Sequence, residues 1–527
     1  MQFWTTRGES IRRAPAPADV VGVSSGHLTP ITVVLSIMVA GIWLQLSTYP
    51  NHDVAWVLWG AREILHGAKF GRDIIEPNPP LAWYLSLPTT ALAEWIHVPL
   101  DWTFRVAVAI AGACSAASLA WLAARERSEL GVACLCGIAG LALLILPGRE
   151  FGQREHLLMI AILPYLALCA GWLSGREPAS ARVRLGLGII AGLGVALKPY
   201  FLAAPALTEL GLLLLGSRRP AIFRAENLGI ATVCLAYLLW IATFERAYAL
   251  EAAPLAGSIY WSFNLPLSAI LPALLTQAAV AAPFAGIALL KRDALGAITG
   301  FAWLGLAASY LVQQKGYGYH LLPVIIANLL LIASVLTNGT LDGKVRVAAS
   351  TVAVVFAFTC AAPLRNWWVI NKPGGQRSHE IDRILASIDR EARNGRFLAV
   401  SVHPYPSFPA AIYTSARYTS STNSEWFLPA VAQIRLNGAT GHDTAAIERH
   451  AREFILHDLG ARPNLVLIDT NSARHTVSSR RFDILAFYEE DPRFRSLWSS
   501  YREIERIGDY RQFVLVEGQL PPVRAIG

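Results

Sequence analysis

Long apolar runs constrain this chain more than any other feature of its sequence. They recur from Leu28 to residue 363, and a helix of ~20 apolar residues spans the ~30 Å hydrocarbon core of a bilayer. The chain has 527 residues, of which 54% are hydrophobic and only 16% are charged. An ordinary soluble domain carries roughly 25% charge, so the composition excludes one. We therefore expect most of the chain to lie in a membrane.

The runs predict a mainly α-helical membrane protein with about eleven transmembrane helices. The first begins near Leu28 and is too long for a cleaved signal peptide, so residues 1–27 are interpreted as a cytoplasmic leader. Lys198-Pro199 interrupts one apolar stretch, which indicates either a tight outward turn or a broken helix lining a cavity. The other candidate spans are residues 103–124, 129–147, 156–174, 184–197, 199–216, 226–244, 268–290, 294–312, 319–337 and 346–363.

The charges predict which loops lie on the same side. Cytoplasmic loops are rich in Lys and Arg, and five loops fit this rule if the proline-rich segment 80–98 lies along the membrane surface instead of crossing. These charges also account for the net charge of +8, so we expect no nucleic-acid partner. The five basic loops contain Arg125 and Arg127; Arg176, Arg182 and Arg184; Arg218, Arg219 and Arg224; Lys291 and Arg292; and Lys344 and Arg346.

From Arg365 onward the composition becomes that of a soluble domain. The pattern predicts an amphipathic helix over residues 379–394. It also predicts strands over residues 397–402, 465–469 and 513–517. We expect residues 28–364 to form the transmembrane domain and residues 365–527 to form an α/β domain on the extracytoplasmic side.

The first outer loop, residues 49–102, carries the clearest candidate for catalysis. Residues 54–65 repeat apolar side chains at helical spacing, so Asp53 is expected in the first turn of a surface helix. A helix N-terminus favours an ionised carboxylate, which suits a base that accepts a proton from a hydroxyl. The alternative is that Asn51 and Asp53 only cap the helix. Glu76 and Asn78 lie in a proline-rich stretch that could equally be a rigid connector.

Three further outer segments carry polar side chains that could meet a ligand. Arg154, Glu155 and His156 end the loop before one span, where they could also form a solvated cap. Lys198 lies at the proline break, where it could neutralise a lipid phosphate or extend to the membrane surface.

The last of these segments is Gln313-Gln314-Lys315-Gly316-Tyr317-Gly318-Tyr319-His320. Its glycines allow the backbone to approach a ligand closely. Lys315 can pair with phosphate, while Tyr319 and His320 can donate hydrogen bonds. A tight turn with aromatic anchors is the alternative.

In order and topology these features resemble the GT-C superfamily of membrane glycosyltransferases. That superfamily includes protein O-mannosyltransferases, of glycosyltransferase family 39, and lipid A aminoarabinose transferases. The resemblance covers roughly residues 28–365 and begins with Asp53 after the first span, followed by Glu76-Pro77-Asn78-Pro79-Pro80. It implies a GT-C-type bundle with juxtamembrane helices in the first outer loop, in the inner membrane of a bacterial cell.

The resemblance also implies a reaction. A sugar moves from a polyprenyl-phosphate donor to a hydroxyl of a glycan, lipid or protein on the extracytoplasmic face, with Asp53 as general base and inversion at the anomeric carbon. The donor phosphate is expected to bind Lys315, His320, Tyr319, Lys198 and Arg154. Candidates for the acceptor side are His52, Glu76, Asn78, Glu155 and His156. A divalent cation on Asp53, Glu155 and His156 is conceivable, but a monophosphate leaving group paired with cations can dispense with a metal.

Two other classes of function remain open. A transporter or flippase of lipid-linked sugars predicts charged residues buried in the middle of spans, whereas here they gather on one face. A non-catalytic assembly or sensor protein predicts that Asp53 can be replaced without effect.

Overall fold

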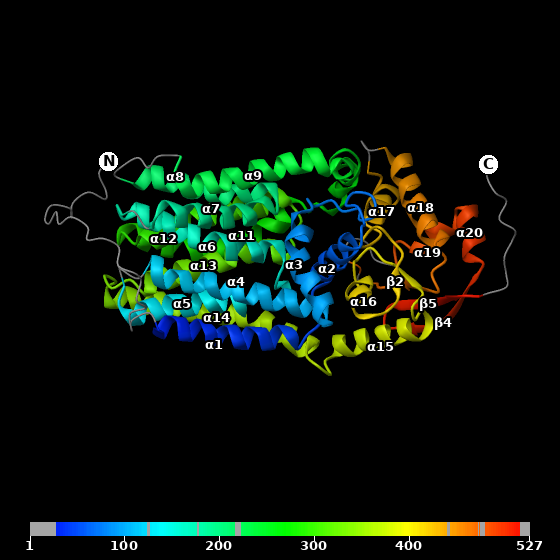
Figure 1. The fold of residues 1–527 in the computed structure, drawn as a ribbon, viewed down its shortest axis with the longest axis horizontal. Helices are drawn as coiled ribbons and strands as arrows, with labels where there is room; N and C mark the ends of the chain where they lie inside the picture. The colour runs from blue at the N-terminus through cyan, green and yellow to red at the C-terminus, as the bar shows by residue number, and fades with distance from the viewer. Residues whose placement is uncertain are drawn as a thin grey trace. The chain divides into compact units, whose positions relative to one another are not determined.

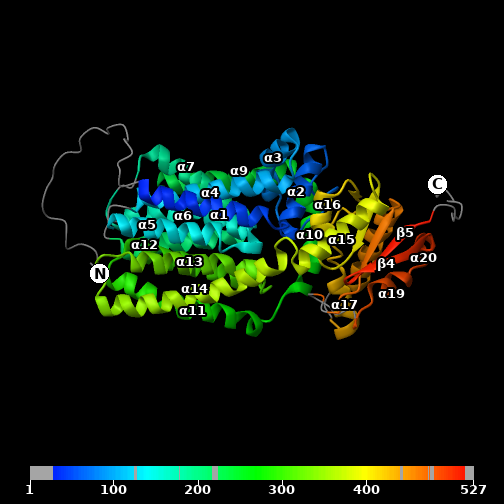
Figure 2. The same cartoon turned by 90° about the horizontal axis from the view of Figure 1, so that it is seen from below.

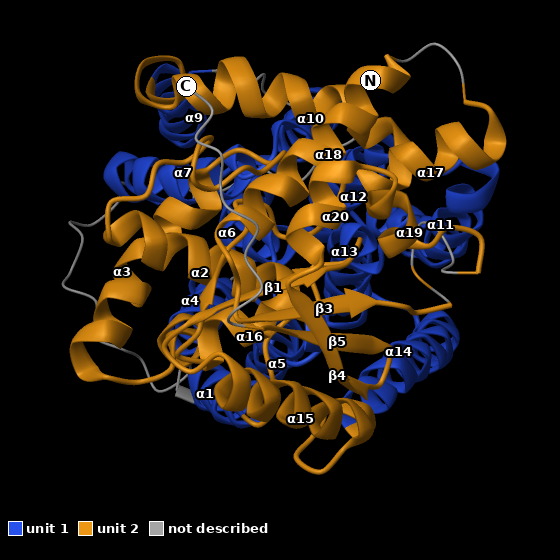
Figure 3. Cartoon of the chain, turned by 90° about the vertical axis from the view of Figure 1, so that its right-hand side faces the viewer, with its two compact units in different colours: residues 1–46, 105–239, 265–368 blue, residues 47–104, 240–264, 369–527 orange. Residues whose placement is uncertain are grey.

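A computed structural model describes residues 28–123, 127–176, 179–216, 223–439, 443–472, 474 and 480–516. The leader 1–27 and the basic residues Arg125, Arg218 and Arg219 lie outside the described residues. The chain forms two compact units (Figure 3). Unit 1 contains the described residues of 1–46, 105–239 and 265–368, and unit 2 those of 47–104, 240–264 and 369–527.

Unit 1 is a helical bundle whose helices run alongside one another (Figure 1). Each of the predicted spans forms a helix. These helices are α1 (Leu28–Leu46), most of α4 (Leu100–Leu122), α5 (Glu129–Leu144), α6 (Arg154–Leu173), α7 (Ala181–Ala196), α8 (Ala203–Leu215), most of α9 (Ala225–Phe244), α11 (Leu267–Leu290), α12 (Ala294–Gln313), α13 (Gly318–Leu336) and most of α14 (Gly343–Asn371). Short 3-10 turns at Gly148–Glu150 and Pro199–Leu202 precede α6 and α8.

Among the described residues, eight helices are long and apolar enough to cross a membrane. They are α1, α4, α6, α9, α11, α12, α13 and α14, and they make the chain a multi-pass membrane protein. Helices α5, α7 and α8 have only 16, 16 and 13 residues. The full number of crossings therefore stays a prediction.

Helix α6 forms the centre of the bundle, because nearly all of its side chains are buried. Helices α7, α8, α12 and α13 pack against it. Gly305 of α12 lies where α12 meets α8, and a Cβ atom there would be 2.3 Å from the carbonyl oxygen of Ala203. Only glycine permits this close approach of two backbones.

The apolar stretch around Lys198 is a broken helix. Helix α7 ends at Ala196, and Lys198 has an extended backbone with φ −150° and ψ 135°. Pro199 then begins the 3-10 turn that leads into α8. Proline has no N–H to continue a preceding helix, so the break follows from the sequence itself.

Loops that the charge rule places on one side meet at one end of the bundle. Arg127, before α5, donates hydrogen bonds to Asp293 Oδ1 at 3.0 Å and to Ser334 Oγ at 2.8 Å. Ser334 in turn donates to Asp293 Oδ2 at 2.7 Å, and Arg127 Nε donates to Thr337 at 3.1 Å. This buried cluster joins the α4–α5, α11–α12 and α13–α14 connections, all predicted to be cytoplasmic. Which end faces the cytoplasm stays a prediction.

Unit 2 combines the first outer loop with the C-terminal region. In its described part a five-stranded sheet has the order β2-β1-β3-β5-β4, with β1 parallel to β2 and β3, and β5 antiparallel to β3 and β4. The strands are β1 (Arg396–Val400), β2 (Arg417–Tyr418), β3 (Leu465–Asp469), β4 (Tyr501–Ile507) and β5 (Tyr510–Leu515). The helices are α2 (His52–Leu65), α3 (Leu81–Ile96), α10 (Ala253–Ile259), α15 (Gln376–Glu391), α16 (Ser407–Tyr413), α17 (Leu428–Asn437), α18 (Thr444–Gly460), α19 (Ile484–Glu489) and α20 (Pro492–Trp498), with short turns at Tyr248–Ala252 and Tyr260–Phe263.

This arrangement confirms the predicted α/β character of the C-terminal region and adds two strands that the sequence analysis missed. Strand β4 was missed because most of its side chains are charged and exposed, as suits an edge strand. Segment 80–98 contains α3, which has 16 residues, a proline inside it and no place among the eight long apolar helices. That agrees with a helix that does not cross.

The first outer loop packs against the C-terminal region within unit 2, although the sequence assigned the two to separate domains. The stacked rings of Trp56 and Trp59 in α2 have centroids 5.0 Å apart, and Phe408 of α16 lies 5.1 Å from Trp56. Arg62 donates to the carbonyl oxygen of Ala411 at 3.1 Å. Large aromatic contacts of this kind dominate the energy of an interface between elements. Helix α2 is therefore held by residues some 350 positions later in the chain.

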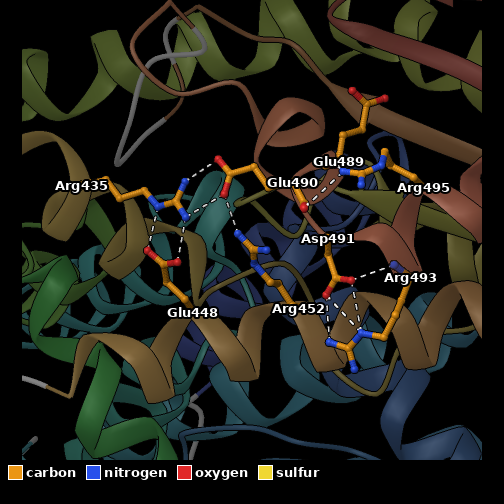
Figure 4. A network of polar contacts seen from close by, with 8 residues as sticks. All are labelled: Arg435, Glu448, Arg452, Glu489, Glu490, Asp491, Arg493 and Arg495. Carbon is orange, nitrogen blue, oxygen red and sulfur yellow. Dashed lines mark hydrogen bonds and ion pairs between the residues drawn. The ribbon is translucent and has the colours of Figure 1, made fainter.

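A surface ion-pair network ties the C-terminal helices together (Figure 4). Arg435 of α17 binds Glu448 of α18 with two bonds of 2.7 Å and also binds Glu490, which follows α19. Arg452 donates to the same Glu490 at 2.6 Å. Isolated surface pairs stabilise little, but a bidentate network restrains several elements together. Its role is therefore structural.

We expect Arg127→Ala to lower the free energy of unfolding by about 3–5 kcal/mol, because it leaves the buried Asp293 without its cation. Equilibrium unfolding in mixed micelles measures this change. The matched control is Lys344→Ala, an exposed cation in the first turn of α14 that should change stability by less than about 0.5 kcal/mol. Equal effects of the two substitutions would contradict a structural role for the Arg127 cluster.

Candidate functional site

A buried ion pair lies at the end of unit 1 opposite the Arg127 cluster. Lys198 Nζ donates to Glu155 Oε1 at 2.5 Å and to Gln313 Oε1 at 3.2 Å. Both partners of the pair are buried, with 2% exposure for Lys198 and 0% for Glu155. Glu155 lies in the first turn of α6. The pair joins the α5–α6, α7–α8 and α12–α13 connections, which were predicted to lie outside.

His320 extends this cluster from the first turn of α13. Its Nε2 lies 3.7 Å from Glu155 Oε1. Lys198, Arg154 and Lys315 are all close enough to act on the His320 ring electrostatically. Within the described part of the chain, Glu155 Oε2 and His320 Nδ1 are buried polar atoms without a hydrogen-bond partner. Buried polar atoms are normally satisfied, so these two mark a place for water or a ligand.

The α12–α13 turn brings Lys315 into the cluster. Gln314 and Gly316 have positive φ values of 51° and 63°, and a Cβ atom at Gly316 would lie 3.0 Å from the Leu265 side chain. The turn therefore needs glycine at position 316. Burial, and then the positive charge of Lys198, lower the pKa of Lys315 to about 7.

The cluster is rich in positive charge. Arg154, Lys198 and Lys315 contribute three basic side chains, and Glu155 contributes a carboxylate. The ring of Tyr319 lies 5.5 Å from Lys198 Nζ. Basic side chains gathered in this way favour an anion, and a phosphate monoester has the charge and oxygen atoms to match them. All five residues predicted to bind the donor phosphate thus gather in one cluster.

An apolar groove of about 570 Å³ lies in the same unit. Its walls are mostly α11, α13 and α14, which run side by side in Figure 2, and they include Leu322, Ile325, Val355 and Phe356. The groove reaches Gly318, the first residue of α13, three positions after Lys315. An apolar groove that ends beside a cationic turn suits an amphiphile with an acidic head.

His156, predicted beside the active site, belongs to the core. Its ring is buried, Nδ1 accepts a hydrogen bond from the Gly152 N–H at 2.9 Å, and Nε2 lies 2.7 Å from the Leu143 carbonyl oxygen. Adjacent residues of a helix point in directions about 100° apart. With Glu155 facing the cluster, His156 faces the bundle interior.

Asp53 lies at the start of α2 in unit 2. Its backbone N–H donates to the side chain of Asn51 at 2.9 Å, so Asn51 is the helix cap. The side chain of Asp53 keeps 20% of its surface exposed and lies 3.7 Å from His52 Nε2. Asp53 therefore presents a carboxylate that the capping interaction does not use.

His403, to which the sequence analysis gave no role, lies beside these residues. The centroids of the His52 and His403 rings are 4.3 Å apart. His403 follows strand β1, and its Nδ1 accepts the Tyr405 N–H at 3.1 Å, so its ring hydrogen is on Nε2. Residues 52 and 403 are distant in sequence, and a lone histidine in a loop gave no local signal.

Glu76 and Asn78 support α2. Glu76 is buried, and its Oε2 accepts a hydrogen bond from Trp56 Nε1 at 2.8 Å. Its Oε1 accepts from the Asn78 N–H at 3.1 Å and from the Asn78 side chain. These contacts match the connector interpretation: they hold the proline-rich stretch against α2.

No group of three or more His, Cys, Asp or Glu side chains in the described ranges could hold a metal ion. The conceivable ligands were Asp53, Glu155 and His156. Both ring nitrogens of His156 are engaged within the bundle core. The residues therefore do not fit the cation that their sequence positions made conceivable.

We expect sulfate binding to weaken as the pH rises through about 7, because Lys315 loses its charge there. Sulfate keeps its own charge between about pH 6 and pH 9, so calorimetry in nanodiscs isolates the protein group. Lys315→Gln should abolish this pH dependence of sulfate binding. Lys291→Gln, which replaces an exposed lysine of the α11–α12 connection, should retain it. If sulfate affinity still falls near pH 7 in Lys315→Gln, another group is responsible for the pH dependence.

No family model matches the chain, and no curated protein matches it. Similar solved structures include the oligosaccharyltransferase AglB of Archaeoglobus fulgidus with an inhibitory peptide and a dolichol-phosphate, at 11% identity and a TM-score of 0.46 over 93% of this chain and 75% of that one. The apo oligosaccharyltransferase of the same organism has 10% identity and a TM-score of 0.44 over 84% and 69% of the two chains. Its complex with zinc and sulfate has 12% identity and a TM-score of 0.44 over 94% and 74%. All three are oligosaccharyltransferases, and the likeness is distant.

Proposed function

We propose that this chain is a membrane glycosyltransferase that moves a sugar from a polyprenyl-phosphate donor to an acceptor hydroxyl. The observation that carries the proposal is the buried cluster in unit 1, which gathers Lys198, Arg154, Lys315 and His320 around Glu155. The reaction takes place on the extracytoplasmic face of a bacterial inner membrane.

The cluster binds the donor phosphate. When the bond between the anomeric carbon and the phosphate oxygen breaks, the bonding electrons stay on the phosphate. Lys198, Lys315 and Arg154 stabilise this developing charge, and their partial burial strengthens the effect. The cation that a metal-dependent transferase would need is thereby replaced by side chains.

The lipid part of the donor has a matching surface. The apolar groove along α11, α13 and α14 accommodates an isoprenoid chain, and its lining includes Gly318, which is close in sequence to Lys315. Both the groove and the cationic cluster belong to the same unit, which supports a donor with an apolar tail and an acidic head. A soluble nucleotide sugar has no long apolar chain that could occupy such a groove.

Asp53 serves as the general base. The acceptor oxygen attacks the anomeric carbon from the side opposite the phosphate, and its proton passes to the Asp53 carboxylate, so the configuration inverts. The partial exposure of Asp53 in the first turn of α2 leaves its carboxylate accessible to an acceptor hydroxyl. His52 and His403 line the same end of α2 and position the acceptor.

Asp53→Asn should lower the transfer rate about 10²- to 10⁴-fold, the usual contribution of a general base. Release of free polyprenyl phosphate in nanodiscs, with a panel of lipid-linked sugars and a membrane-glycan extract, measures the rate. Asp389→Asn, in α15 of the same unit, is the matched control and should remain active. Loss of lipid from one leaflet without phosphate release would instead identify a flippase.

His403→Ala should lower kcat about 10- to 100-fold with a smaller effect on KM, because His52 and the acceptor lose a positioning contact. His403→Gln, which keeps a hydrogen-bond donor, should recover part of the rate. His379→Ala removes an exposed histidine of α15 and serves as control. An effect of His403→Ala on stability alone would assign it a purely structural role.

A further inference from the structure

A large cleft in unit 2 is not explained by the reaction chemistry. It has a volume of about 1310 Å³, larger than the ~300–1,000 Å³ of small-molecule sites. One wall is the face of α2 that carries Trp59, Glu63 and the following His66, and the opposite wall is formed by residues 414–421 and the end of α18. A cleft of this size accommodates several linked units of a polymer.

The charges of the cleft favour an anionic occupant. Arg72 and Arg417 line it, are exposed, and form no ion pair or side-chain hydrogen bond within the described ranges. Arg396 also lines it, and its side chain donates only to the carbonyl oxygen of Ala461, at 2.7 Å. Three acids line the cleft as well. Glu453 pairs with Arg493 at 2.9 Å, Glu63 lies 3.6 Å from Arg62, another residue of the lining, and Asp73 accepts the Lys69 N–H at 2.7 Å. Arg72, Arg396 and Arg417 thus form no ion pair within the described ranges.

The uncharged residues that line the cleft suit the binding of a saccharide. Thr414, Ser415, Thr419, Ser420 and Ser421 line the cleft. The Thr414 and Thr419 hydroxyls donate to the carbonyl oxygens of Ala410 and Phe397, which leaves their oxygen atoms as acceptors for sugar hydroxyls. Apolar side chains, among them Phe454, share the surface about equally with polar groups. Sugar rings present the same mixture of C–H faces and hydroxyl edges.

The cleft offers an extended peptide few backbone hydrogen-bonding groups. Peptides commonly add to an exposed sheet edge through backbone hydrogen bonds. The edge strand at this cleft, β2, has only two residues. Just beyond it, the carbonyl oxygen of Ser421 already accepts the N–H of Ile75 at 2.8 Å.

The cleft lies along α2, whose first turn carries Asp53. Trp59 is six residues after Asp53 and Glu63 ten, so with ~1.5 Å per residue the cleft wall extends from ~9 to ~15 Å along α2. We infer that this cleft binds the acceptor, and that the acceptor is an anionic oligosaccharide chain, such as one bearing uronic acid carboxylates. The role as acceptor site rests on the function proposed above, whereas binding itself does not.

Binding of galacturonate hexamers and of neutral maltohexaose to the full chain in phosphatidylcholine nanodiscs tests this inference. The galacturonate hexamer should bind at least tenfold more tightly, with an affinity that falls as salt rises. The double substitution Arg72→Gln, Arg417→Gln should reduce that affinity tenfold or more. If the double variant does not fold, the single substitution Arg72→Gln replaces it and should reduce the affinity by a smaller factor. Arg502→Gln, which replaces an exposed arginine of β4 outside the cleft, should leave the affinity for the galacturonate hexamer unchanged.

Several outcomes would overturn the inference. They are absence of galacturonate binding, equal affinity for the two hexamers, an unchanged affinity in the double variant, and tighter binding of a hexaglutamate peptide, which would indicate a protein acceptor. Asp53→Asn separates the two proposals, since it should abolish transfer and leave galacturonate binding intact. Binding without transfer from any lipid-linked sugar would refute the proposed function alone, and transfer to neutral glycans without galacturonate binding would refute the cleft inference alone.

Discussion

The ion pair of Lys198 and Glu155 organises one end of the helical bundle. Both side chains are withdrawn from solvent, and neither would be stable there alone, because an unpaired buried charge costs several kcal/mol. Their contact joins the α5–α6 and α7–α8 connections, and Gln313 and His320 add the α12–α13 connection. The helices that carry these residues therefore cannot shift independently without breaking the pair.

The surroundings of the same pair are rich in basic side chains. Burial, and then the positive charge of Lys198, lower the pKa of Lys315, and Arg154 belongs to the same cluster. In the proposed reaction, the donor phosphate gains negative charge as its bond to the sugar breaks. The basic side chains then bind the transition state better than the ground state.

In unit 2, the C-terminal region holds the first outer loop in shape. The rings of Trp56, Trp59 and Phe408 pack together, and Glu76 fastens the proline-rich stretch to the same helix. The position of Asp53 thus depends on residues that follow the last membrane span. The C-terminal region therefore contributes to the proposed acceptor site, through His403 and the cleft beside α2.

The sequence by itself determined the helices, the break at Pro199, the grouping of loops by charge and most of the phosphate-binding candidates. These follow from hydrophobicity, proline geometry and local charge, which act over a few residues. Only the tertiary structure decided that Glu155 pairs with Lys198 while its neighbour His156 enters the core, that His403 joins His52, and that the first loop shares a unit with the C-terminal region. Those contacts join residues from 13 to about 350 positions apart, and they are selected by packing and by the cost of burying charge, which no local pattern records.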